Sequence, residues 1–243
     1  MDMANNAAAV RPTMADIRPC GACPVRGIAV CCILEPDEIY ALAEIVHEIH
    51  RAHRQSVILE GDPADHFFIV TSGVASIEKL LSDGRRQILG FLYPSDFFGL
   101  AVDNCYAYNV SAVTNLSLCR FERPKYLALI DRFPKLERRL LGMASDELAA
   151  SQEHALVLGC KTAKEKVASF LSMISERSYR LGRVPSPIWV PMNRADIAAY
   201  LGLTTETTSR MFTELKKDGL IQTLPNSMIE LLEIDRLKKI ARD

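Results

Sequence analysis

The sequence predicts an α+β protein in which a small antiparallel β-roll, a long helix and a C-terminal winged helix-turn-helix follow one another. Residues 56–123 consist of short apolar runs separated by turn residues, a spacing typical of a small roll or barrel. Helical periodicity returns at Pro124 and continues to about Gly159. Two short helices joined by a glycine-containing turn then precede a β-hairpin, which is the order of a winged helix-turn-helix.

A helix is expected ahead of the roll, over residues 35–52. Ile39, Leu42, Ile45 and Ile49 recur there at the spacing of one helical face. We therefore expect the first strand of the roll to begin only after this helix.

The composition describes a chain with room for two domains of ordinary size and a basic C-terminal third. The chain has 243 residues and a net charge of −1. Residues 161–243 carry 14 lysines and arginines against 10 acidic residues, so the C-terminal third has a net positive charge. A positively charged C-terminal domain is compatible with nucleic-acid binding. An uneven distribution of charge without functional meaning would give the same net charge.

No segment of the sequence has the character of a membrane span or of a secretory leader. The apolar runs stay well short of the roughly 20 residues that cross a bilayer. Residues 1–19 lack the apolar core of a signal peptide and are rich in alanine and asparagine. The sequence therefore predicts a disordered tail over 1–19, no membrane partner, and a cytoplasmic location in which thiols stay reduced.

The long helix carries two rows of residues with a seven-residue repeat. These rows are Leu141, Leu148 and Ala155 and, beside them, Ala144, Ser151 and Leu158. Such a repeat is typical of a coiled-coil seam between two subunits. It equally fits a single helix that packs on its own roll, because small residues interrupt the stripe.

The C-terminal helix pair has clear start and stop signals. Asn193 is a good N-cap for the first helix, and Gly202 ends that helix. Thr204 caps a second helix, which ends at Gly219. A hairpin over residues 220–232 and a last short helix complete the predicted winged helix-turn-helix.

The second of these helices has a polar face near its N-terminus. An arginine on such a face can make two hydrogen bonds to guanine, a glutamate can accept one from cytosine, and a serine can bond several bases. The predicted DNA-contacting residues are Thr204, Thr205, Glu206, Ser209 and Arg210. The alternative is an ordinary solvated face, which the helix-turn-helix spacing makes the weaker interpretation.

Four of the seven cysteines lie within the short segment 20–32. Cys20 and Cys23 form a Cys-x2-Cys pair, and Cys31 can fold back to the same centre, so the spacing suits zinc or an iron–sulfur cluster. Spacing alone leaves the metal and the fourth ligand open. The candidates for that ligand are Cys32, Cys105, Cys119 and Cys160.

From Cys20 to about Leu232 the chain resembles the Crp/Fnr superfamily of bacterial transcription regulators, and within it the Fnr/FnrN/FixK-like branch. The matching stretches are residues 20–31, 68–74, 90–100 and 194–210, of which the last is the most specific. The resemblance implies a cluster-binding segment over 20–34 and a cyclic-nucleotide-binding-like β-roll sensor domain over 35–132. It further implies a dimerisation helix over 133–160 and a winged helix-turn-helix DNA-binding domain over 161–243.

The same resemblance implies an oxygen-labile [4Fe–4S] cluster. Cys20, Cys23 and Cys31 match the first three ligands of the family, and Cys119 matches the fourth, while Cys32 lies outside the pattern. In such relatives the cluster favours the dimer, and oxygen destroys the cluster and releases DNA. The alternative is the same DNA-binding regulator with zinc or a disulfide switch at these thiols and no iron–sulfur cluster.

The implied partners are double-stranded DNA, RNA polymerase and a second copy of the chain. The implied half-site is TTGAT in an inverted repeat, with Arg210 reading its guanine, Glu206 the paired cytosine and Ser209 a neighbouring base. No paired carboxylates, nucleophile elbow or phosphate loop indicates an enzyme.

Two departures from the family pattern affect what the chain responds to. Relatives that bind cyclic nucleotides carry a Gly-Glu-Leu run and a downstream Arg-Ser, whereas residues 98–101 and 108–112 lack both the glutamate and the arginine. A buried phosphate would lack its guanidinium partner, so we expect no response to cyclic nucleotides. Ser151 stands where some relatives carry an acidic residue that opposes dimerisation, which implies a tighter basal dimer.

Overall fold

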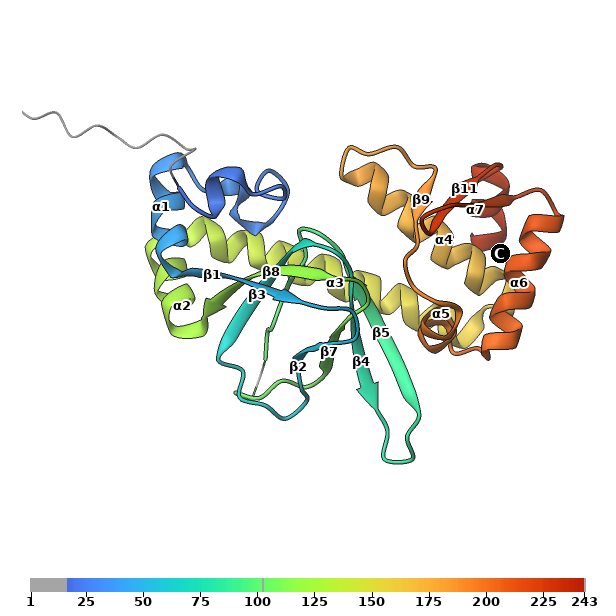
Figure 1. Ribbon diagram of the computed structural model, residues 1–243, viewed down its shortest axis with the longest axis horizontal. Helices are drawn as coiled ribbons and strands as arrows, with labels where there is room; N and C mark the ends of the chain where they lie inside the picture. The colour runs from blue at the N-terminus through green and yellow to red at the C-terminus, as the bar shows by residue number, and fades with distance from the viewer. Residues whose placement is uncertain (1–16, 102, 243) are drawn as a thin grey trace, which may run out of the picture.

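The structure, a computed structural model, describes residues 17–101 and 103–242 and has three parts in sequence order. Figure 1 shows a β-roll in the middle, a long helix α3 (Pro134–Cys160) that runs behind it, and a C-terminal domain on the right. This arrangement confirms the predicted α+β class. The predicted disordered tail, apart from residues 17–19, lies outside the described residues, and Ile17 is buried.

Two four-stranded antiparallel sheets form the roll. One has the order β1 (Val46–Arg51), β8 (Leu116–Glu122), β3 (His66–Ser72) and β6 (Phe97–Phe98). The other has the order β2 (Ser56–Ile58), β7 (Asn109–Ala112), β4 (Ala75–Leu80) and β5 (Arg86–Leu92). Alternation along β8 sends Leu116 and Leu118 into the interior of the roll and places Cys119 and Phe121 in a second core on the other face.

The helix predicted over residues 35–52 is shorter than expected. α1 (Pro36–Ile45) ends where the chain continues directly as β1, and all of β1 pairs with β8 from Val46 opposite Phe121 onwards. The prediction was therefore wrong for residues 46–51. Ile45 and Ile49 fit a helical face, but pairing with a strand some 70 residues away, invisible to local spacing, decides the conformation.

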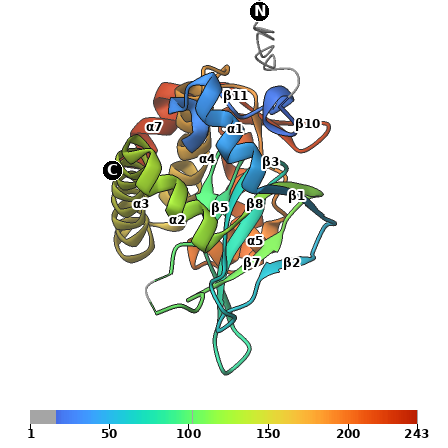
Figure 2. The ribbon, with the colours of Figure 1, turned by 90° about the vertical axis from the view of Figure 1, so that its left-hand side faces the viewer.

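A small helical layer covers the outer face of the β8 sheet. It consists of the short turns η2 (Cys20–Ala22) and η3 (Val30–Ile33), of α1 and of α2 (Arg123–Arg132). Figure 2 looks onto this end of the molecule and shows α1, α2 and α3 in front of the roll. The helical period that begins at Pro124 is interrupted at Phe133, because a residue that precedes a proline is disfavoured in the helical conformation.

α3 is buried only near its two ends. Leu136 packs in the core beside β8, and Val157 packs in the core of the C-terminal domain. Between them Leu141 is 69% exposed and Leu148 is 61% exposed, and Ala144, Ser151 and Ala155 are exposed as well. The predicted seven-residue repeat therefore does not pack on its own roll, which excludes that alternative for most of the stripe.

The C-terminal domain has the helix-turn-helix and hairpin predicted from the sequence. Its elements are α4 (Ala163–Arg180), β9 (Ile188–Trp189), α5 (Arg194–Leu201), α6 (Thr205–Lys217), β10 (Ile221–Leu224), β11 (Met228–Leu231) and α7 (Ile234–Arg242). The two hairpin strands and β9 form one antiparallel sheet. Within the described part of the chain, every helix is too short or too polar to cross a bilayer.

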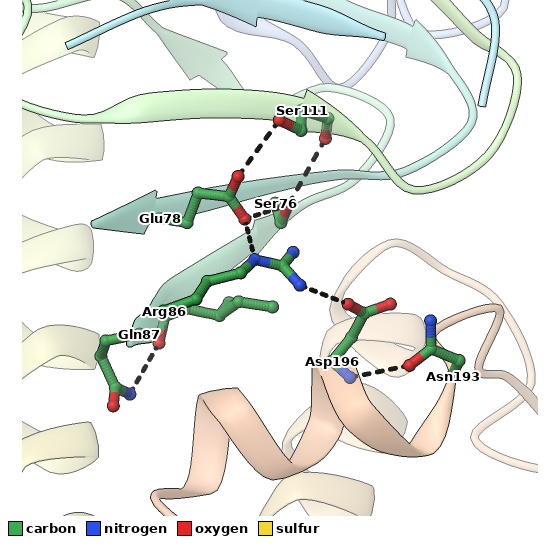
Figure 3. Close-up of polar contacts among 8 residues, drawn as sticks. Ser76, Glu78, Arg86, Gln87, Ser111, Asn193 and Asp196 are labelled. Atoms are coloured by element: carbon green, nitrogen blue, oxygen red, sulfur yellow. Dashed lines mark hydrogen bonds and ion pairs between the residues drawn. The ribbon is translucent and has the colours of Figure 1, made fainter. Parts of the chain in front are cut away.

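An ion-pair network docks the first helix of the helix-turn-helix against the roll (Figure 3). Arg86 on β5 donates from Nη1 to Oδ1 of Asp196 on α5 at 2.8 Å, and its Nε pairs with Glu78 on β4. The side chains of Glu78 and Asp196 are only 9% and 12% exposed. Ser111 also donates to Glu78 at 3.2 Å, so the buried carboxylate is held from two sides.

We expect Arg86→Ala to loosen this docking. The substitution leaves two poorly hydrated carboxylates facing each other, at a cost of roughly 1–2 kcal/mol, between the values for exposed and buried pairs. Urea unfolding measures the change, and Arg85→Ala, which removes an exposed arginine paired with Asp83, is the matched control. Equal free energies of unfolding for the two variants would show that the network does not stabilise the contact between α5 and the roll.

Candidate nucleic-acid interface and cysteine cluster

The turn between α5 and α6 sets the direction of the second helix. Gly202 adopts a left-handed conformation with φ of 61°, which glycine accepts readily, and α5 ends there. Thr204 then caps α6, because its Oγ1 accepts a hydrogen bond from the Thr207 N–H at 3.1 Å. Both signals are local, and the structure places them where the sequence predicted.

α6 has one buried face and one exposed face. The buried side chains are Thr208, Met211, Phe212 and Leu215. The predicted DNA-contacting residues lie together at the N-terminal half of the helix, where Thr204, Thr205, Glu206 and Arg210 are exposed and Ser209 is partly exposed. The polar stripe is therefore available to a partner and does not pack inside the molecule.

The two charged side chains among the predicted DNA-contacting residues have no ion-pair partner in the described part of the chain. Among the residues that the structure describes, neither Glu206 nor Arg210 forms an ion pair. The N-terminal end of a helix also carries partial positive charge, which favours phosphate groups nearby. The exposed N-terminal end of α6 thus offers hydrogen-bond donors and acceptors on its side chains, and its partial positive charge attracts a polyanion.

One cationic contact behind this face was not predicted. The guanidinium carbon of Arg194, at the start of α5, lies 3.5 Å from the centre of the Phe212 ring on α6. This cation–π contact joins the two helices on the side away from the stripe. No spacing rule in the sequence links these two residues, so only the fold reveals the contact.

Four cysteines from two distant segments share one core. Cys20 and Cys31 of the N-terminal segment are each 7% exposed, Cys119 of β8 is 9% exposed, and Cys23 is half-buried. Cys119 reaches this core because the alternation of β8 turns it away from the interior of the roll. The structure thus brings together all four cysteines that the resemblance assigned to a cluster.

Burial and mutual repulsion favour the neutral form of the three buried thiols, Cys20, Cys31 and Cys119. Burial raises the pKa of Cys20 to about 11 and of Cys31 to about 12, and neighbouring thiolate charges add to both shifts. Burial and the charges of Cys23, Cys20 and Cys31 raise the pKa of Cys119 further still. A charge on Cys23 opposes ionisation of Cys20, Cys31 and Cys119, in keeping with the core that the four residues share.

The other three cysteines lie outside this buried core, although Cys32 directly follows Cys31 in the chain. Cys32, Cys105 and Cys160 are exposed, and Cys105 lies beside Pro63 in the roll. Among the described residues, no three His, Cys, Asp or Glu side chains stand close enough to hold a single metal ion. Cysteine thiolates are ligands of both iron–sulfur clusters and zinc, so the donor atoms in the shared core suit a metal group of either kind.

The segment around Gly99, which the resemblance aligns with the phosphate site of nucleotide-binding relatives, forms hydrogen bonds within the chain. The Gly99 N–H donates to Tyr108 Oη at 3.2 Å, and Arg123 Nη2 donates to the Gly99 carbonyl at 2.9 Å. Arg123 Nε also bonds the Ala64 carbonyl. Leu100, which is 50% exposed, stands directly after Gly99 where those relatives have an acidic residue.

Comparisons with known proteins agree with this architecture. Residues 48–133 match the cyclic nucleotide-binding domain family, and residues 165–240 match the Crp-like helix-turn-helix domain family. The chain is 38% identical to the transcriptional activator protein FnrL of Cereibacter sphaeroides, with 92% of each chain covered. It is 35% identical to the nitrogen fixation regulation protein FixK of Bradyrhizobium diazoefficiens, with 96% and 99% covered.

A solved structure supports the same relationship. The chain superimposes on FixK2 from Bradyrhizobium japonicum with a TM-score of 0.75 and 33% identity, covering 81% of this chain and 97% of that one. The similar proteins are named as regulators and not as enzymes. The exposed stripe on α6, the two matched domains and the near full-length similarity lead to one conclusion: the chain belongs to the Crp/Fnr family of DNA-binding transcription regulators.

Proposed function

We propose that this regulator responds to oxygen through a [4Fe–4S] cluster and, as a dimer, reads TTGAT-type inverted repeats in double-stranded DNA. The observation that carries the proposal is the convergence of Cys20, Cys23, Cys31 and Cys119 in one core from two segments of the chain. Relatives named FnrL and FixK, which cover more than nine-tenths of the chain, support the same branch of the family.

The four cysteines are the residues that would hold the cluster. What a bound cluster supplies, by the resemblance, is sensitivity to oxygen. Cys119 belongs to a rigid central strand, whereas Cys20, Cys23 and Cys31 lie on a segment of short turns. Joint ligation fastens that segment to β8. Because η3 also contacts α3, and Leu136 of α3 packs in the same core, fastening the segment acts on the start of α3.

The dimer forms along α3 in this proposal. The exposed row that contains Leu141 and Leu148 is the apolar seam that a second copy would cover. Two recognition helices related by a twofold axis can then reach half-sites one DNA turn apart, roughly 34–36 Å. Only a dimer spans both half-sites, so control of the dimer controls binding, and the bound dimer contacts RNA polymerase.

Within each half-site, side chains of α6 contact the base edges. Arg210 reads the guanine, Glu206 the cytosine paired with it, and Ser209 a neighbouring base. Thr204 and Thr205 lie at the end of the helix where phosphates approach. Cyclic nucleotides have no role in this proposal, because Tyr108 and Arg123 already bond the Gly99 backbone and no acidic residue follows it.

We expect Cys119→Ser to abolish retention of the cluster. Protein purified without oxygen should carry about four irons per chain when wild type and close to none in the variant. Cys105→Ser, which alters an exposed cysteine outside the core, is the control and should keep its iron. Iron retained by Cys119→Ser would reassign the fourth ligand, and zinc in place of iron would support a structural-metal alternative.

Leu148→Glu should disrupt the dimer. It places an unpaired carboxylate from each chain in the seam and should weaken association by at least roughly 100-fold. Analytical ultracentrifugation of the iron-loaded protein measures this. Leu127→Glu, at a leucine on α2 that is 46% exposed and outside the stripe, is the control. A Leu148→Glu protein that stays dimeric would place the interface elsewhere.

Arg210→Ala should reduce the preference for the TTGAT site. The loss should be roughly 1–3 kcal/mol of discrimination at the guanine, seen as the ratio of Kd values for operators with and without that base pair. Lys239→Ala, on α7, is the control, because it removes a positive charge outside α6. It should leave the ratio of the two Kd values unchanged. Unchanged preference in Arg210→Ala would remove this residue from the base-reading set.

A further inference from the structure

Tyr126 is a fully buried tyrosine in the core that contains the cysteines. It lies on α2 with 0% exposure. Its ring centre is 5.1 Å from that of Phe121, 5.4 Å from that of Phe67 and 5.7 Å from that of Phe97. This aromatic surround fixes the ring and separates it from water.

The hydroxyl of Tyr126 has no hydrogen-bond partner among the described residues. Buried tyrosine hydroxyls nearly always have one, because an unsatisfied polar group in an apolar core is costly. Phenylalanine would pack equally well against the aromatic neighbours. The hydroxyl therefore indicates an acceptor that the described residues do not supply.

The cysteines lie on the same side of the β8 sheet as this hydroxyl. Cys20, Cys31 and Cys119 belong to the same buried core as Tyr126. A thiolate or sulfide is an electron-rich acceptor, and the Tyr126 hydroxyl is a hydrogen-bond donor in the same core.

We propose that the Tyr126 hydroxyl donates a hydrogen bond to the sulfur atoms of the group held by the four cysteines, the Cys31 thiolate included. The inference rests on the proposed iron–sulfur function and makes Tyr126 a positioning residue. Hydrogen bonds to cluster sulfurs tune the stability and potential of such groups, and outer partners of metal ligands commonly change affinity when removed. Tyr126 thus sets how firmly this chain keeps its cluster.

The test compares Tyr126→Phe with Tyr93→Phe. Tyr93 is a buried tyrosine in the other large core, and its hydroxyl contacts the Met192 sulfur at 3.8 Å, so the control removes a buried hydroxyl far from the cysteines. Iron transfer to a chelator is followed without oxygen, together with the iron–sulfur stretching bands in the resonance Raman spectrum. Tyr126→Phe should release iron roughly 10-fold faster than wild type and shift these bands, while Tyr93→Phe changes neither.

A second measurement uses the cluster-free chain. Because the hydroxyl has no partner there, Tyr126→Phe should keep or raise the melting temperature of that form. A lower melting temperature would reveal an internal partner and overturn the inference. Iron release and Raman bands identical to those of an iron-loaded wild type would also overturn it, while leaving the proposed function intact. A wild-type protein that binds no iron–sulfur cluster would overturn both.

Discussion

Four thiols packed into one core cannot all ionise unless positive charge lies among them, and the arrangement of this chain depends on that constraint. Burial and the neighbouring sulfurs raise the pKa of Cys20, Cys31 and Cys119. In our proposal a bound metal group would reverse this balance and would join the N-terminal segment to the central strand β8. Apolar packing around residues such as Val25 and Val30 already holds the segment against this core.

One long helix, α3, joins this core to the C-terminal domain. α3 begins in the cysteine core at Leu136 and ends in the core of the C-terminal domain at Val157. Its exposed middle is the part that faces a second copy in our proposal. Near its far end the His154 ring stacks on Tyr200 of α5, with centres 4.0 Å apart, so the helix-turn-helix is fastened to α3 as well as to the roll through Arg86. In our proposal a change at the start of α3 therefore acts on both the dimer seam and the helix-turn-helix.

Local signals were predictable from the sequence, and long-range contacts were not. Asn193, Gly202 and Thr204 define the helix-turn-helix because caps act within a few residues. The strand at 46–51 was mistaken for helix because its partner is distant in sequence. The spacing of the cysteines left Cys119 as one candidate among several, and only the resemblance and then the fold set it apart. The Arg194–Phe212 contact and the unpartnered hydroxyl of Tyr126 have no signature in the sequence.

The most direct test of the central claim follows iron content and operator affinity in the same anaerobic sample before and after exposure to air. The account predicts that the visible absorption of the cluster and the affinity for a TTGAT inverted repeat are lost together. It also predicts that the dimer dissociates over the same period. Affinity that persists after the iron is gone, or a sample that binds the operator tightly without ever holding iron, would contradict it.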